Sequence, residues 1–188
     1  MSSVHSFLPT VIHNWPIWLV SAVLILAASI DGWKLKVPNR ITYPLIIGGW
    51  IYATASFGWE GLAWSLLGTV VGLALLLPAY AIGGMGAGDV KLLAGVGAWI
   101  GSTDTLYAFC VSAIVGGVIA LLMISWRTEG RRHLTQFWGI LQEIVIIRNL
   151  NTLSEIAAER KSRMQLLPYG IPIAIGSISY FVWAGMLI

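Results

Sequence analysis

Charged side chains are scarce in this chain. Only 10% of its 188 residues are Asp, Glu, Lys or Arg, whereas 57% are hydrophobic. An average soluble domain carries about 25% charged residues. The shortage excludes an ordinary soluble domain and, together with long apolar runs, predicts an integral membrane protein.

Cysteine and histidine are also rare. The single cysteine, Cys110, excludes a disulfide within the chain and a zinc site built from cysteines. We predict that its side chain is buried, because it lies in the middle of an apolar run. The three histidines, His5, His13 and His133, do not have the spacing of metal ligands. The sequence therefore predicts no metal site.

The apolar runs predict an all-α, polytopic membrane protein with six transmembrane helices. A straight helix needs about 20 residues to cross the hydrocarbon core of a bilayer. The fourth segment is too short for this, so it is either a half-span or is lengthened by the glycine-rich residues before it. The six segments cover residues 15–30, 41–57, 62–82, 90–100, 106–126 and 166–187.

The positions of lysine and arginine predict the orientation. With six spans and an outside N-terminus, all 11 Lys and Arg residues lie on one side, whereas Glu60 and Asp104 lie on the other. The positive-inside rule makes the basic side cytoplasmic. Because these residues are scattered between apolar runs, the net charge of +3 does not indicate a nucleic-acid partner. No Lys or Arg precedes Trp15, which predicts a retained first helix rather than a cleaved signal peptide.

The largest part outside the predicted spans is residues 127–165. Apolar residues recur there at helical spacing beside basic residues. This pattern fits a helix lying on the membrane surface or one packed against the membrane domain. We predict one membrane-embedded domain, residues 1–188, with a cytoplasmic helical insertion at 127–165.

Two aspartates lie at the same predicted face. Asp31 follows the first segment, and Asp89 closes a glycine-rich run at 83–89 that contains Gly-x-Gly-Asp. Carboxylates at membrane depth are costly and usually functional. Held a few ångströms apart, two carboxylates share a proton, so that one can accept a proton from water while the other donates to a carbonyl oxygen. Asp31 and Asp89 are therefore candidate catalytic residues for peptide hydrolysis, which needs no metal or organic cofactor. Taken alone, Asp31 fits equally well an interfacial residue paired with Lys34.

Three neighbours of Asp89 are candidate substrate-binding residues. Gly86 and Gly88 lack side chains, so an extended substrate backbone could approach them closely. Tight helix packing is the alternative for these glycines. Lys91 is placed to contact substrate or to shift the pKa values of the two carboxyl groups. The alternative is that Lys91 only anchors the cytoplasmic end of its helix, as the positive-inside rule describes.

Three passages carry a resemblance to a known family. The first is Asp31 with the basic, Pro-Asn-containing loop that follows it at 34–42. The second is the Gly-x-Gly-Asp motif with its following lysine, at 83–92, and the third is Leu-Pro-Tyr-Gly-Ile-Pro at 167–172. Together they resemble the type IV prepilin peptidase family, also called type IV leader peptidases, from about Ile30 to the end of the chain.

The resemblance implies a membrane-embedded aspartic endopeptidase with Asp31 and Asp89 as its catalytic pair. Such enzymes remove short basic leaders from prepilin, pseudopilin or archaeal flagellin-like precursors at the cytoplasmic face of the inner (plasma) membrane. The implied partners are such a precursor, the lipid bilayer and a pilus or secretion assembly machinery. Many bacterial members also have a four-cysteine domain and methylate the new N-terminus. With one cysteine, this chain resembles the small peptidase-only branch, and we predict no N-methyltransferase activity.

Three other interpretations remain. Presenilin and signal peptide peptidase also contain Gly-x-Gly-Asp, but they have a Tyr-Asp pair, whereas Asp31 follows Ile30. A proton-coupled small transporter would favour an internal repeat and acids near the midplane, neither of which the sequence predicts. The third alternative is a catalytically inactive assembly factor for a pilus or secretion system.

Overall fold

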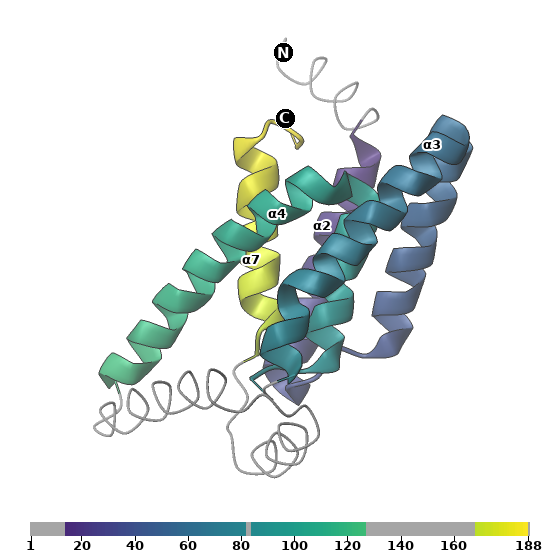
Figure 1. The fold of residues 1–188 in the computed structure, drawn as a ribbon. Coiled ribbons are helices and arrows are strands. Elements are labelled where there is room, and N and C mark those ends of the chain that lie inside the picture. The colour runs from purple at the N-terminus through teal and green to yellow at the C-terminus, as the bar shows by residue number, and fades with distance from the viewer. Residues whose placement is uncertain (1–13, 82–83, 127–167, 188) are drawn as a thin grey trace.

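The computed structural model describes residues 14–81, 84–126 and 168–187, and the regular structure in these ranges is entirely α-helical. The predicted insertion at 127–165 and the three histidines lie outside the described residues. The helices are α2 (Trp15–Lys34), α3 (Asn39–Ala81), α4 (Ala87–Trp126) and α7 (Gly170–Trp183) (Figure 1). The all-α class is thus confirmed for the described part of the chain.

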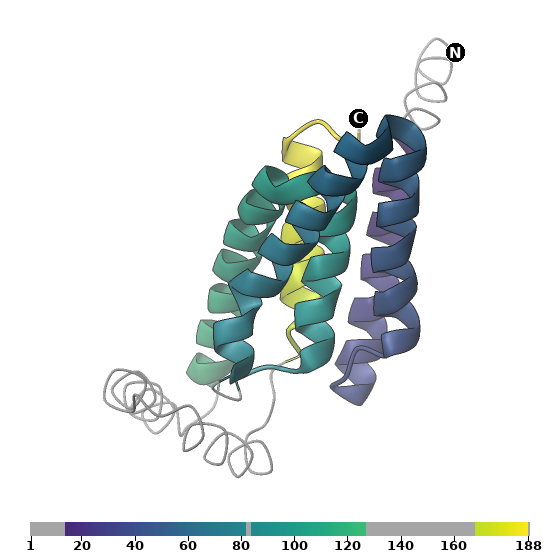
Figure 2. The same ribbon diagram turned by 45° about the vertical axis from the view of Figure 1, so that its right-hand side comes forward.

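The two longest helices each fold back at a glycine. The backbone of Gly58 has φ 64° and ψ −145°, and that of Gly101 has φ 79° and ψ −179°. Only glycine adopts these conformations readily. Figure 2 shows the two limbs of α3 meeting at the fold-back and spreading apart towards their other ends. The Trp50 indole N–H joins them by donating to Thr69 Oγ1 at 3.0 Å.

Three helices are long and apolar enough to cross a membrane. They are α2, α3 and the part of α4 from Ala87 to Leu122, and α7 is a shorter apolar helix. These lengths and compositions are those expected of a membrane protein. The number of six transmembrane helices remains a prediction.

The two helix boundaries nearest the aspartates differ from those predicted. Helix α2 continues to Lys34 instead of ending at residue 30, and Leu35 ends it in the left-handed conformation with φ 50°. Helix α4 begins at Ala87, so glycine-rich residues do lengthen the fourth segment, which runs to the break at Gly101. Asp31 therefore lies inside the last turns of α2, and Asp89 lies inside the first turn of α4.

Small residues allow the helices to pack closely. A Cβ atom at Gly49 would lie 2.7 Å from Ala98 Cβ, and one at Gly72 would lie 2.6 Å from the Leu93 carbonyl oxygen. Close approach at small residues is the usual way in which membrane helices associate.

Helix α3 packs mainly on α4, and α7 lies between α2 and the second limb of α4 (Figure 1). The fully buried side chains at the centre include Leu24, Leu92, Leu93, Val96 and Phe181.

The prediction that Cys110 is buried is wrong. Its side chain is exposed on α4. Apolar side chains such as Ile51 and Ile114 are also exposed on these helices. In a membrane protein the lipid-facing surface is as apolar as the interior, so an apolar run does not reveal which of its residues are buried.

Candidate active site

Asp31 and Asp89 come from different helices and meet at one end of the bundle. Asp31 is 2% exposed and Asp89 is 5% exposed. The two carboxyl groups are close enough to interact electrostatically. The fold thus brings together the two aspartates that the sequence selected.

A backbone N–H holds the Asp31 carboxylate in place. The amide of Gly170, the first residue of α7, donates to Asp31 Oδ2 at 2.8 Å. A Cβ atom at Gly170 would lie 2.9 Å from the same oxygen and 3.0 Å from Asp31 Cβ. Hydrogen bonds from backbone amides to carboxylates are charge-assisted and comparatively strong. Glycine at position 170 therefore allows α7 to begin directly against the Asp31 carboxylate.

Only one of the Asp89 carboxylate oxygens has a protein partner among the described residues. The Gly86 amide donates to Oδ2 at 3.2 Å, whereas Oδ1 is buried and accepts no hydrogen bond there. An unpaired polar atom in a buried position is unfavourable by about 1–3 kcal/mol. This oxygen is therefore the acceptor best suited to a water molecule or a substrate N–H.

The glycines of the motif differ in their surroundings. A Cβ atom at Gly88 would lie 2.5 Å from the Val37 carbonyl oxygen, so Gly88 lets the α2–α3 loop approach α4. A Cβ atom at Gly86 would lie 3.3 Å from Asp89 Oδ2 and 3.9 Å from the Gly88 nitrogen. Of the two, Gly86 has the more open surroundings beside the carboxylate.

Lys91 connects the start of α4 to the start of α3. Its ammonium group donates to Asn39 Oδ1 at 3.0 Å and to the Tyr43 hydroxyl at 3.1 Å. It also lies 4.8 Å from the centre of the Tyr43 ring, a distance that permits a cation–π interaction. Together with Gly88 and Val37, these contacts fix the first turn of α4 against the loop before α3.

Tyr169 is a site residue that the sequence interpretation missed. It precedes Gly170, and it interacts electrostatically with Asp89. A phenol is protonated at neutral pH, so the Tyr169 side chain is a hydrogen-bond donor near Asp89. Its place next to Gly170 in the Pro-Tyr-Gly passage was the signal that could have identified it.

A metal site of the usual kind is not seen in the described ranges. No group of three or more His, Cys, Asp or Glu side chains lies together at residues 14–81, 84–126 and 168–187.

Comparison with known proteins identifies the family. The model of the type IV leader peptidase family matches residues 18–121, which is more than half of the chain and includes both aspartates. A prepilin leader peptidase/N-methyltransferase of Neisseria gonorrhoeae is 36% identical over 122 residues, which are 61% of this chain and 41% of that protein. The protein of the same name from Aeromonas salmonicida (strain A449) is 31% identical over 118 residues, 59% of this chain and 40% of that protein.

The chain spans about two fifths of the length of these curated relatives. No solved structure matches it. The family match and the relatives agree with the motifs around the two buried carboxylates. This chain belongs to the type IV leader peptidase family.

Proposed function

We propose that this protein is an aspartic endopeptidase that removes the short basic leader from prepilin, pseudopilin or archaeal flagellin-like precursors. The observation that carries the proposal is the pair of buried, interacting carboxylates, Asp31 and Asp89. Membership of the type IV leader peptidase family supports the class of substrate.

The pair would hydrolyse the peptide bond by acid–base catalysis. One carboxylate accepts a proton from water while the water oxygen bonds to the scissile carbonyl carbon. The other, protonated, carboxyl group donates to the carbonyl oxygen. When the tetrahedral intermediate collapses, the C–N bond breaks, and the leaving amine takes the proton that the first carboxylate accepted from water. The second carboxylate takes back the proton that it gave to the carbonyl oxygen, so the pair returns to its starting state. The unpaired Asp89 Oδ1 supports a role of Asp89 in binding the water or the scissile group.

Gly86, Gly88 and Lys91 complete the proposed site as its substrate-binding residues. The surroundings of Gly86, which are less crowded than those of Gly88, suit an extended substrate backbone beside Asp89. Gly88 sets the position of this segment against Val37. An ammonium group has three donors, and Asn39 and Tyr43 use two of those of Lys91, so one remains for a substrate carbonyl.

The proposed reaction takes place at the cytoplasmic face of the inner membrane. Lys34, Lys36 and Lys91 lie in or beside the helix ends that carry the carboxylates, which supports this orientation by the positive-inside rule. The proposed topology has an outside N-terminus and six spans, an arrangement that puts all 11 Lys and Arg residues on one side. The proposed partners are the precursor, the bilayer and a pilus or secretion assembly machinery.

The proposal is tested with purified protein in lipid vesicles and a full-length pilin precursor. Mass spectrometry is expected to show two products that together account for the precursor and one water molecule. An intact precursor combined with proton flux across the vesicle membrane would support a carrier instead. An intact precursor without flux would support an assembly factor.

Replacing Lys91 by methionine is expected to raise the KM for the precursor about tenfold or more. One hydrogen bond to a charged group contributes roughly 1.5–3 kcal/mol, and 1.4 kcal/mol corresponds to a factor of ten. Initial rates at varied precursor concentration measure the effect. Lys34→Met is the matched control, because Lys34 is an exposed lysine at the end of α2. An unchanged KM for Lys91→Met would remove Lys91 from the substrate-binding residues.

Chelation of metal ions is expected to leave the reaction unaffected. The proposed mechanism uses two carboxylates and water, and no step in it uses a Lewis acid. Cleavage rates are compared before and after dialysis against excess EDTA, and again after addition of Mg²⁺ or Zn²⁺. Loss of activity with EDTA and recovery with one metal would contradict the metal-independent mechanism.

A further inference from the structure

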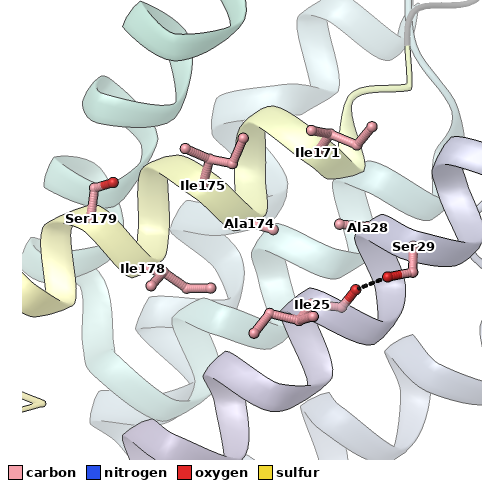
Figure 3. A pocket seen from close by; sticks show the side chains of 8 residues that line it. All are labelled: Ile25, Ala28, Ser29, Ile171, Ala174, Ile175, Ile178 and Ser179. Carbon is pink, nitrogen blue, oxygen red and sulfur yellow. Dashed lines mark hydrogen bonds between the residues drawn. The ribbon is translucent and has the colours of Figure 1, made fainter.

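Helices α2 and α7 leave an open apolar groove of about 480 Å³ between them. Figure 3 shows that α2 and α7 both contribute side chains to it. Isoleucine and alanine form most of the lining, and Ser29 and Ser179 contribute hydroxyl groups. The Ser29 hydroxyl is satisfied locally, because it donates to the Ile25 carbonyl oxygen at 2.8 Å. The lining residues are Ile25, Ala28, Ser29, Ile171, Ala174, Ile175, Ile178 and Ser179.

One end of this groove adjoins the carboxylate pair. Ile171 lines the groove and directly follows Gly170, whose amide donates to Asp31 Oδ2. On the opposite helix, a Cβ atom at Gly32 would lie 3.5 Å from Ile171 Cδ1. The groove therefore begins within one residue of the contacts that hold Asp31.

From this end the groove follows α7 towards the other end of the bundle. Its lining on α7 extends from Ile171 to Ser179, which corresponds to about 12 Å at 1.5 Å per residue. That length matches about two turns of an α-helix lying alongside. A volume of 480 Å³ is in the range of ordinary ligand sites, which is suitable for the side chains on one face of a helix but too small for a whole helix.

Exposure of apolar groups does not by itself identify a binding surface in a membrane protein. Ile25 is 58% exposed and Ile175 is 46% exposed, but Ile51 on α3 reaches 64%. Two features set the groove apart from such lipid-facing positions. First, the groove is hollow, and Ala28 and Ala174 in its lining permit close approach of another helix. Second, one end of the groove adjoins Gly170, whose amide holds the Asp31 carboxylate.

Resting on the proposed function, we propose that this groove docks the apolar helix of the precursor. The first two turns after the cleavage junction lie between α2 and α7, and the rest of that helix remains in lipid. An apolar helix seated here has its polar end at Asp31 and Asp89. The groove thereby fixes the register between the start of the apolar segment and the peptide bond that is cut.

Cross-linking tests the position of the precursor directly. Single cysteines are introduced as Ile25→Cys and Ile175→Cys in a Cys110→Ser, Asp89→Asn background, so that the precursor stays uncut. The precursor carries one cysteine in the first two turns of its apolar segment. Because docking raises the local concentration of the paired thiols, we expect a disulfide yield at least about tenfold above that of the controls.

The controls are Ile51→Cys and Ile114→Cys, which replace exposed isoleucines on α3 and α4. Equal yields at all four positions, or higher yields at the controls, would overturn the proposal. Disulfide-linked dimers of the peptidase through the groove positions, without precursor adducts, would also overturn it and point to a second copy. Absence of any adduct at Ile25 and Ile175 would leave lipid as the occupant and reject docking.

Filling the groove gives a second, independent test. Ser179→Trp places a large side chain in it, and Ser56→Trp is the control at another exposed serine, on α3. Cleavage is measured for the membrane-inserted precursor and for a short soluble peptide that spans the junction. We expect Ser179→Trp to lower the ratio of precursor to peptide cleavage about tenfold, whereas Ser56→Trp keeps the native ratio.

The two proposals fail in different ways. If native protein cleaves both substrates and Ser179→Trp keeps the native ratio, docking in the groove is wrong while the peptidase function stands. If native protein cleaves neither substrate, the peptidase function is wrong, and the cross-linking yields still decide whether the groove holds the apolar helix.

Discussion

Asp31→Asn and Asp89→Asn are each expected to lower the rate of leader cleavage by about 10³-fold or more. Asparagine has nearly the size of aspartate but can neither accept a proton from water nor donate one as a carboxylic acid, and general acid–base catalysis contributes about 10²–10⁴-fold. Both carboxylates are buried and interact with each other. In the proposed mechanism the two roles belong to one pair that shares a proton, so either substitution removes the mechanism. Rates are measured with purified variants and a pilin precursor.

Asp104→Asn is the matched control for these substitutions. Asp104 accepts a hydrogen bond from the Tyr180 hydroxyl at 2.6 Å. It follows the break at Gly101, whereas Asp89 lies in the first turn of the same helix. We expect Asp104→Asn to retain most of the activity. Activity of Asp31→Asn or Asp89→Asn within tenfold of native protein, with all variants folded by thermal unfolding, would contradict the proposed catalytic pair.

Gly170→Ala is expected to lower kcat about 100-fold while changing KM little. The added methyl group would lie 2.9 Å from Asp31 Oδ2 and 3.1 Å from Asp31 Cγ. Atoms this close must move apart, so the carboxylate shifts and its hydrogen bond from the Gly170 amide weakens. A displacement of about 1 Å at a catalytic group can cost about 10²-fold in rate. Steady-state kinetics with the precursor separates the effects on kcat and KM.

The second limb of α4 contains a glycine that serves as a matched control for Gly170→Ala. Gly117 is a helical glycine, and a Cβ atom there would meet nothing within 4 Å. Gly117→Ala is therefore expected to keep native activity and to be neutral or stabilising, since alanine is favoured over glycine inside helices by roughly 0.5–1 kcal/mol. A native kcat for Gly170→Ala would show that the contact with Asp31 does not position the carboxylate.

The sequence was sufficient to predict the all-α class and to select two aspartates that the fold brings together. Charge scarcity and apolar runs are strong signals, and carboxylates at the ends of such runs are unusual. The boundaries were less accurate, because the polarity of Asp31 was interpreted as the end of a helix. In the structure α2 continues past Asp31 to Lys34, and the Asp31 side chain is buried between helices.

The contacts that build the site could not be predicted from local patterns. The amide of Gly170 reaches Asp31 across 139 positions of sequence, and Gly88 meets Val37 of the α2–α3 loop. Helical periodicity reports on neighbours within a few turns, whereas these contacts depend on how distant helices pack. The exposure of Cys110 was missed for a related reason, since a lipid-facing side chain is as apolar as a buried one.

The proposed leader cleavage by Asp31 and Asp89 can be measured through the intact mass of a pilin precursor. The precursor is expressed together with native protein or with the double variant Asp31→Asn, Asp89→Asn. We expect loss of the leader with native protein only, leaving a new N-terminus without a methyl group. A precursor that keeps its leader beside native protein, or loses it equally beside the double variant, would show that this pair does not cut it.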